Sequence, residues 1–140
     1  MQQSINRNRK QPYCGITEII LPGQNSDTFS FDTSEIILPM LAHLSHNAQN
    51  KWLTWIRSKE DFSFRIDKCT LENFGFDLNK LRIVYCQDSQ DSLRIMWNAL
   101  SNGNSDTVVA NSDFVGKDQL RSLEHAAVKG GARGVLLCYR

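Results

Sequence analysis

The chain has 140 residues, of which 41% are hydrophobic and 22% are charged, and these proportions are typical of one globular domain. Sixteen lysines and arginines nearly balance fifteen acidic residues, so the formal net charge of +1 argues against a nucleic-acid partner, which needs clustered basic surface. No apolar run approaches the roughly 20 residues of a membrane span, and the N-terminus lacks a secretory signal, so we expect a cytoplasmic protein without a membrane contact.

The first half of the chain begins with a polar stretch and continues with a strand, a helix and a second strand. Residues 1–13 show no apolar periodicity and are predicted to be a flexible N-terminal tail. A strand is predicted at 16–21 and a second, apolar on both faces, at 51–56. Between them Ser34 is a suitable cap for a helix whose apolar residues have helical spacing: Ile36, Ile37, Met40, Leu41 and Leu44.

The second half alternates helices and strands. A short helix is predicted near 67–73, ended by Gly75, then one capped by Asp91 or Ser92, and one over 117–129 ended by Gly130-Gly131. We expect the buried faces of the two longer helices to carry Leu93, Met96, Trp97 and Leu100 in the first, and Leu120, Leu123, Ala127 and Val128 in the second. Strands are predicted at 81–85, 107–110 and 134–139. This alternation predicts an α/β domain with a mainly parallel sheet flanked by helices.

The loop after the first strand, LPGQNSDT, has the position of a phosphate-binding loop but not its chemistry. A Walker loop needs G-x-x-x-x-G-K-[ST], whose backbone N–H groups, lysine and hydroxyl hold the phosphates and magnesium. Here Gly23 stands alone, and no lysine occurs between residues 11 and 50. We therefore expect no nucleotide cofactor. An ATPase with an unorthodox loop is an alternative that nucleotide-dependent thermal stabilisation would support.

Other catalytic or metal-binding patterns do not emerge from the sequence. His43 and His46 are three residues apart on a predicted helix and could share a face, but no third metal ligand is evident, which favours a solvated helix face. The four cysteines are widely spaced, without a Cys-x-x-Cys pair, and are expected to be reduced. We therefore predict a protein that binds a partner rather than an enzyme, with no catalytic residue, cofactor or metal.

Four stretches together carry a family resemblance. They are IILPMLAHLSHNAQNKWLTWI, GFDLNKLRIVY, DSLRIMWNALSNGNSDTVVA and LEHAAVKGGARGVLLCYR. Their order and spacing resemble the SulA family of bacterial SOS cell-division inhibitors over about residues 15–140. The resemblance implies a single RecA-like domain over 14–140 with a degenerate phosphate loop. It also implies that the protein binds the tubulin-like GTPase FtsZ, sequesters its subunits and so blocks polymerisation and septation during the response to DNA damage, without catalysis.

The resemblance also assigns site residues. Lys51 matches the basic residue before the first tryptophan of the Trp-containing strand, and Ile56 matches the apolar residue after the second. Lys80 matches the lysine of the Gly-x-x-Leu-x-Lys stretch. A tryptophan that the family uses between these points has no counterpart, so exposed aromatics beside an arginine in the charged loop are expected to replace it. The candidate partner-binding residues are Lys51, Trp55, Ile56, Phe62, Phe64, Arg65 and Lys80.

Each assignment has a structural alternative. Lys51 and Lys80 would serve equally as ordinary cations at strand edges, and Ile56 as a packing residue. Trp52 and Trp55 are three apart on one strand and hence on opposite faces, so at least one belongs to the core. Phenylalanines of the charged loop could cover the sheet edge instead of contacting a partner.

Three further alternatives concern partners. The ImuA proteins, scaffolds of a DNA-damage mutagenesis polymerase complex, resemble the same stretches, although they are usually longer at the N-terminus. An edge strand could pair two copies into a homodimer. Because the last predicted strand lies almost at the chain end, the C-terminal tail that presents family members to the Lon protease is not expected, and Lon is the less supported partner.

Overall fold

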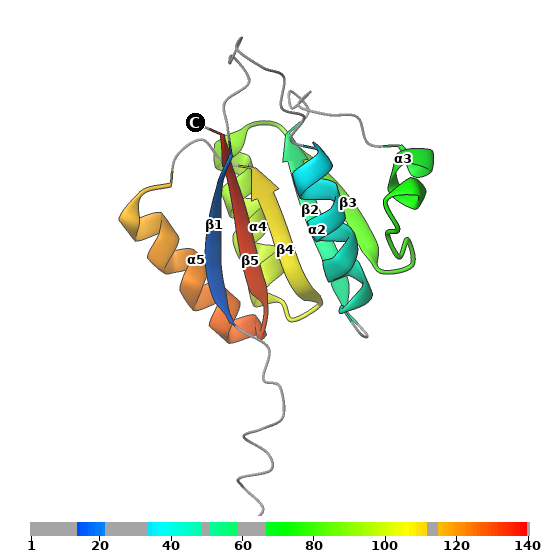
Figure 1. The fold of residues 1–140 in the computed structure, drawn as a ribbon. Helices are drawn as coiled ribbons and strands as arrows, with labels where there is room; N and C mark the ends of the chain where they lie inside the picture. The colour runs from blue at the N-terminus through cyan, green and yellow to red at the C-terminus, as the bar shows by residue number, and fades with distance from the viewer. Residues whose placement is uncertain (1–13, 22–33, 49–50, 59–66, 112–114, 140) are drawn as a thin grey trace, which may run out of the picture.

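The computed structural model describes residues 14–21, 34–48, 51–58, 67–111 and 115–139. Strands and helices alternate along these residues, as the sequence predicts (Figure 1). Their bounds are β1 (Gly15–Leu21), α2 (Ser34–His46), β2 (Trp52–Ser58), α3 (Lys68–Asn73), β3 (Leu81–Cys86), α4 (Ser89–Ser101), β4 (Ser105–Asn111), α5 (Lys117–Gly130) and β5 (Arg133–Tyr139). Residues 1–13 and the loop around Gly23 lie outside the described residues, and so the predicted tail and degenerate phosphate loop stay predictions.

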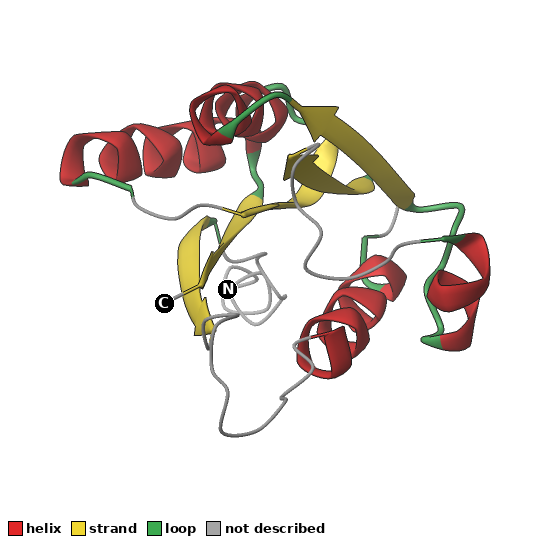
Figure 2. Ribbon diagram, turned by 90° about the horizontal axis from the view of Figure 1, so that it is seen from above, coloured by secondary structure: helices red, strands yellow, loops and turns green. Residues whose placement is uncertain are grey.

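The described strands form one sheet in the order β1-β5-β4-β2-β3, and each neighbouring pair is parallel. Helices α2 and α3 cover one face, and α4 and α5 cover the other, so the sheet is the middle of three layers (Figure 2). In a parallel sheet every connection must return the chain to the end of the sheet where the strands begin. The helices on both faces supply these crossover connections. The predicted α/β class with a parallel sheet is confirmed, and the RecA-like relationship stays a prediction.

Each face of the sheet carries its own hydrophobic core. Side chains alternate between the faces along a strand, so neighbouring residues of one strand enter different cores. The core under α4 and α5 includes Ile56, Met96, Leu100, Val108 and Leu136. The core under α2 includes Ile37, Leu41, Trp55, Val109 and Leu137. The middle strands therefore have continuous apolar runs, as strands buried on both faces do.

Local hydrogen bonds and one glycine define where the helices begin and end. Asp67 caps α3 by accepting from the backbone N–H of Thr70 at 2.8 Å. Asp88 caps α4 by accepting from the backbone N–H of Asp91 at 2.9 Å. The helix therefore begins before Asp91 and Ser92, and their prediction as caps is wrong. Gly131 ends α5 in the left-handed conformation, with φ of 66°, which glycine adopts without a steric penalty.

Two side chains that we expected in the core are exposed. Trp97 of α4 is 36% exposed and Val128 of α5 is 65% exposed. In α4, Met96 and Leu100 occupy the stripe that faces the sheet, and each residue turns the helix by about 100°. Trp97, which follows Met96 directly, therefore points away from the sheet. The prediction that Trp97 and Val128 are buried is wrong for this geometric reason.

Candidate partner-binding site

Two predicted site residues, Trp55 and Ile56, are core residues. Both are 0% exposed, because β2 lies between β4 and β3 and helices cover both of its faces. Trp55 packs in the core under α2, and Ile56 packs in the core under α4 and α5. Their burial corrects the prediction that they contact a partner, and agrees with the alternative in which they serve packing.

Two other predicted residues, Lys51 and Lys80, lie at the starts of neighbouring strands. Lys51 directly precedes β2 and Lys80 directly precedes β3, so both lie at the edge where these parallel strands begin. The backbone N–H of Leu53 donates to the carbonyl of Lys80 at 2.8 Å, which fixes the two strand starts side by side. Both lysines are partly exposed, and within the described part of the chain neither forms an ion pair. Residues 29 apart in sequence thus lie at the same end of the sheet. The remaining predicted residues, Phe62, Phe64 and Arg65, lie outside the described residues.

An exposed tryptophan stands at the same edge. Trp52, the first residue of β2, is 38% exposed, and the guanidinium carbon of Arg82 lies 5.6 Å from the centre of its ring. This distance is within the range of a cation–π contact. Trp52 and Trp55 are thus on opposite faces, as predicted, with only Trp55 in the core. We call Lys51, Trp52, Lys80 and Arg82 the basic edge.

The arginine of the basic edge is held by the buried hydroxyl of Thr54. Nη2 of Arg82 donates to Oγ1 of Thr54 at 3.2 Å, and this hydroxyl shares a hydrogen bond of 2.7 Å with Oγ of Ser105. Thr54 and Ser105 are both buried. A guanidinium fixed in this way loses less conformational entropy when it meets a partner than a freely rotating one.

A change of register shapes the strand start. Trp52 pairs with Ser105 of β4, whereas Leu53 pairs with Thr107, so Asp106 is an extra residue between them. Such an irregularity twists the strand and redirects side chains. It brings Ser105 beside Thr54 and places Trp52 at the margin of the sheet. Strand alternation in the sequence separates Trp52 from Trp55, but only the strand order and this register show which of them is exposed beside Arg82.

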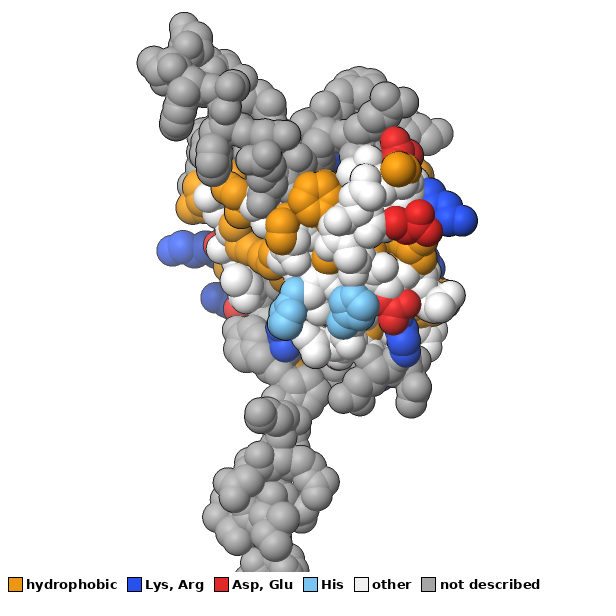
Figure 3. All heavy atoms as spheres, turned by 45° about the vertical axis from the view of Figure 1, so that its right-hand side comes forward, with side chains coloured by type: hydrophobic (Ala, Val, Ile, Leu, Met, Phe, Trp, Pro, Cys, Tyr) orange, Lys and Arg blue, Asp and Glu red, His pale blue; other side chains and the backbone are white. Residues whose placement is uncertain are grey.

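The two histidines of α2 have protein contacts. The side-chain nitrogen Nε2 of His46 lies 2.6 Å from the carbonyl oxygen of Gly75, and the amide of Asn47 contacts His43. Two histidines lie in front on the face shown in Figure 3, with hydrophobic side chains gathered above them. Among the described residues no three metal-ligating side chains come together, and no helix in that part is long and apolar enough to cross a membrane.

Two groups away from the basic edge have shifted pKa values. Hydrogen bonds from Arg94 and from the backbone of Gln87 lower the pKa of Asp91 in the first turn of α4. Burial raises the pKa of the Cys86 thiol at the end of β3. The Asp91 carboxylate accepts from the backbone N–H of Gln87 and from Arg94, and the Cys86 thiol donates to the backbone carbonyl of Asp88. Both groups therefore serve the start of α4.

Comparison with known proteins gives concordant results. A family model described as "Cell division inhibitor SulA" matches residues 16–134. Two curated proteins described as cell division inhibitor SulA, from Cronobacter turicensis and Cronobacter sakazakii, are each 32% identical to this chain over 106 residues. The match covers 75% of this chain and 60% of each relative. The crystal structure of SulA from Pseudomonas aeruginosa has the same fold, with a TM-score of 0.74 at 22% identity, covering 89% of this chain and 98% of that one.

Proposed function

The chain belongs to the SulA family of cell division inhibitors, and from this membership we propose that it stops division by binding FtsZ through the basic edge. The curated relatives are longer, since the match spans 60% of their length. The proposal therefore concerns what the domain over residues 16–134 does. Binding alone would suffice, and we propose no catalytic step.

The observation that carries the proposal is the position of Lys51 and Lys80 at the starts of two neighbouring strands. The family resemblance assigns both to inhibition, and this assignment is supported by their partial exposure at the end of the sheet where β2 and β3 begin. Trp52 and Arg82 lie on the same edge. Tryptophan and arginine are enriched among the residues that dominate binding energy in protein interfaces. We propose that Trp52 supplies the aromatic contact for which the sequence comparison found no counterpart.

The charge of the edge suggests how the partner is recognised. Its three cations favour a carboxylate-bearing surface, and complementary charge speeds association and fixes orientation. On FtsZ, we propose that the bound inhibitor covers the face that carries the catalytic loop. Because an FtsZ active site is completed only when two subunits stack, filament growth and GTP hydrolysis would then stop together.

The experiment is GTP-driven FtsZ assembly, followed by light scattering and phosphate release while the inhibitor is added. We expect both signals to fall together, with a midpoint near equal amounts of the two proteins. The double variant Lys51→Glu, Lys80→Glu should need at least about tenfold more protein, because it places like charges against an acidic surface. Lys117→Glu, which reverses a charge at the start of α5, is the matched control and should inhibit like the wild type.

Two outcomes would count against the proposal. If the folded wild-type protein leaves both signals unchanged, FtsZ is not its target, and a search for polymerase partners of the ImuA kind becomes the next step. If the wild type inhibits and the double variant inhibits equally well, FtsZ is bound by another surface. Thermal unfolding of each variant, measured in parallel, separates lost binding from lost folding.

A further inference from the structure

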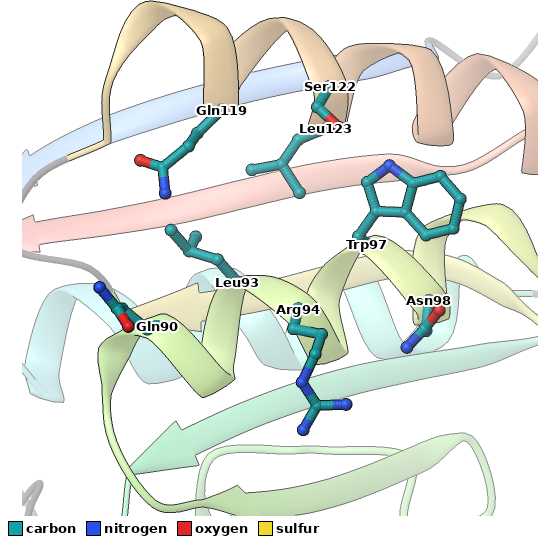
Figure 4. Close-up of a pocket in the computed structure, with 8 residues that line it drawn as sticks. All are labelled: Gln90, Leu93, Arg94, Trp97, Asn98, Gln119, Ser122 and Leu123. Atoms are coloured by element: carbon teal, nitrogen blue, oxygen red, sulfur yellow. The ribbon is translucent and has the colours of Figure 1, made fainter.

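A groove runs between α4 and α5 on the face of the molecule that these helices cover, with a volume of about 430 Å³. Its lining residues come from both helices, and Figure 4 shows Leu93 and Leu123 pointing toward each other between them. Trp97 stands beside this pair, and the amide side chains of Gln90 and Gln119 lie toward one end. The groove is therefore apolar along its middle and polar at its margins.

Trp97 is a large apolar side chain of α4 that the core does not use. It is 36% exposed, and the ammonium nitrogen of Lys129 lies 5.8 Å from the centre of its ring. A tryptophan that keeps part of its apolar surface in water gains free energy when a partner covers it. Packing in the core explains why Met96 and Leu100 of α4 are apolar, because both are fully buried. It does not explain why a tryptophan stands at position 97.

Two cations flank the groove, and they differ in whether an acidic partner is present. Lys129 stands over Trp97, and Arg94 lies on the other flank of α4 (Figure 4). Arg94 contacts Asp91, whose second oxygen accepts from the backbone N–H of Gln87, so that this carboxylate is already engaged. Within the described part of the chain, Lys129 has no carboxylate partner. A ligand for this groove should therefore bring its own negative charge.

We propose that the groove binds an amphipathic helix of a protein partner, with its apolar face on Leu93, Trp97 and Leu123 and a carboxylate directed at Lys129. Two neighbouring helices form the type of groove in which a third helix packs through residues spaced three and four apart. A second copy of this chain is the alternative occupant, and sedimentation of the wild type and of Trp97→Ala distinguishes it from a helical partner. This surface is made by the outer sides of helices and the basic edge by strand starts, so the inference does not depend on FtsZ binding.

The test uses a display library of helical peptides of about 15 residues, with randomised positions on one face, selected on the full chain. We expect the enriched peptides to combine apolar residues at helical spacing with at least one Asp or Glu. Trp97→Ala should weaken their binding by at least about 30-fold, as removal of an interface anchor does. Lys129→Glu should weaken it about tenfold and favour peptides with Lys in place of the acidic residue. Lys68→Glu, on α3 across the sheet, is the matched control and should change nothing.

Three results would overturn the proposal. Enriched peptides that bind Trp97→Ala as tightly as the wild type would place their site elsewhere. Selection of basic peptides, or of none, would contradict the charge argument. A dimer in sedimentation that Trp97→Ala abolishes would make a second copy the occupant. Amide chemical shifts of α4 and α5 in each variant, recorded without peptide, verify that the fold is kept.

Discussion

Replacement of Ile56 by alanine separates the two roles that this residue could have. The family resemblance assigns Ile56 to the partner interface. In the structure Ile56 is 0% exposed and packs in the core under α4 and α5. Its neighbours in that core include Met96, Leu100 and Ala110. Because Ile56 is a core residue, the substitution should lower stability, and any loss of inhibition should follow from unfolding.

The magnitude follows from the atoms removed. Alanine lacks three carbon atoms of isoleucine, and about 0.8 kcal/mol for each gives about 2.4 kcal/mol of lost transfer free energy. A cavity term adds to this value, because a side chain on a middle strand is held by a rigid sheet and its surroundings relax only in part. We expect a destabilisation of about 3–4 kcal/mol, which lowers the melting temperature by about 10 °C.

The assay pairs urea unfolding, followed by tryptophan fluorescence, with FtsZ assembly at a temperature where the variant is folded. Ile56→Ala should unfold at much lower urea and yet inhibit FtsZ like the wild type. Lys51→Ala is the matched comparison and should show the reverse, with wild-type unfolding and weaker inhibition. The reasoning is refuted if Ile56→Ala unfolds like the wild type and fails to inhibit, since Ile56 would then act by contact.

Three other substitutions test different parts of the structure. Gly130→Ala would place a Cβ atom 1.7 Å from the carbonyl oxygen of Leu100, so α4 and α5 must separate, and we expect a loss of about 3 kcal/mol in urea unfolding. Burial raises the pKa of Cys86, so its contribution is complete below the ordinary thiol pKa of about 8.5 and is lost as the pH rises through the higher value of the folded state. Melting temperatures measured from neutral to alkaline pH should therefore fall less for Cys86→Ala than for the wild type. Arg94→Gln removes the hydrogen bond that lowers the pKa of Asp91, and a carboxyl titration by NMR should show this pKa rising toward about 3.9.

The sequence predicts the elements well because periodicity and end signals are local. The alternating strands and helices, the end of α5 at Gly131 and the opposite faces of Trp52 and Trp55 all follow from spacing within a few residues. The exposure of a side chain that lies next to a buried stripe does not follow from local spacing. Met96 and Trp97 are both apolar and adjacent, and only the docking angle of α4 on the sheet decides which one is covered.

The candidate site depends even more on the tertiary structure. Lys51 and Lys80 could be named from the family resemblance, but their proximity requires that β2 and β3 are neighbours. Arg82 could not be found from the sequence, because its contact with Trp52 needs that same pairing and the register shift beside Ser105. The burial of Ile56 likewise reflects the middle position of β2, which no local pattern reveals.

The position of β1 in the sheet bears on how the protein is made. In the described sheet β1 pairs with β5, and Gly15 is opposite Arg133, so the first strand finds its partner only after nearly all of the domain has been synthesised. Contacts this distant in sequence close slowly, because a long loop must be ordered first. During translation β1 must wait as an unpaired, partly apolar segment, open to chaperones and proteases. A growing chain therefore has no complete sheet until β5 has been made, and the domain acquires its native structure late.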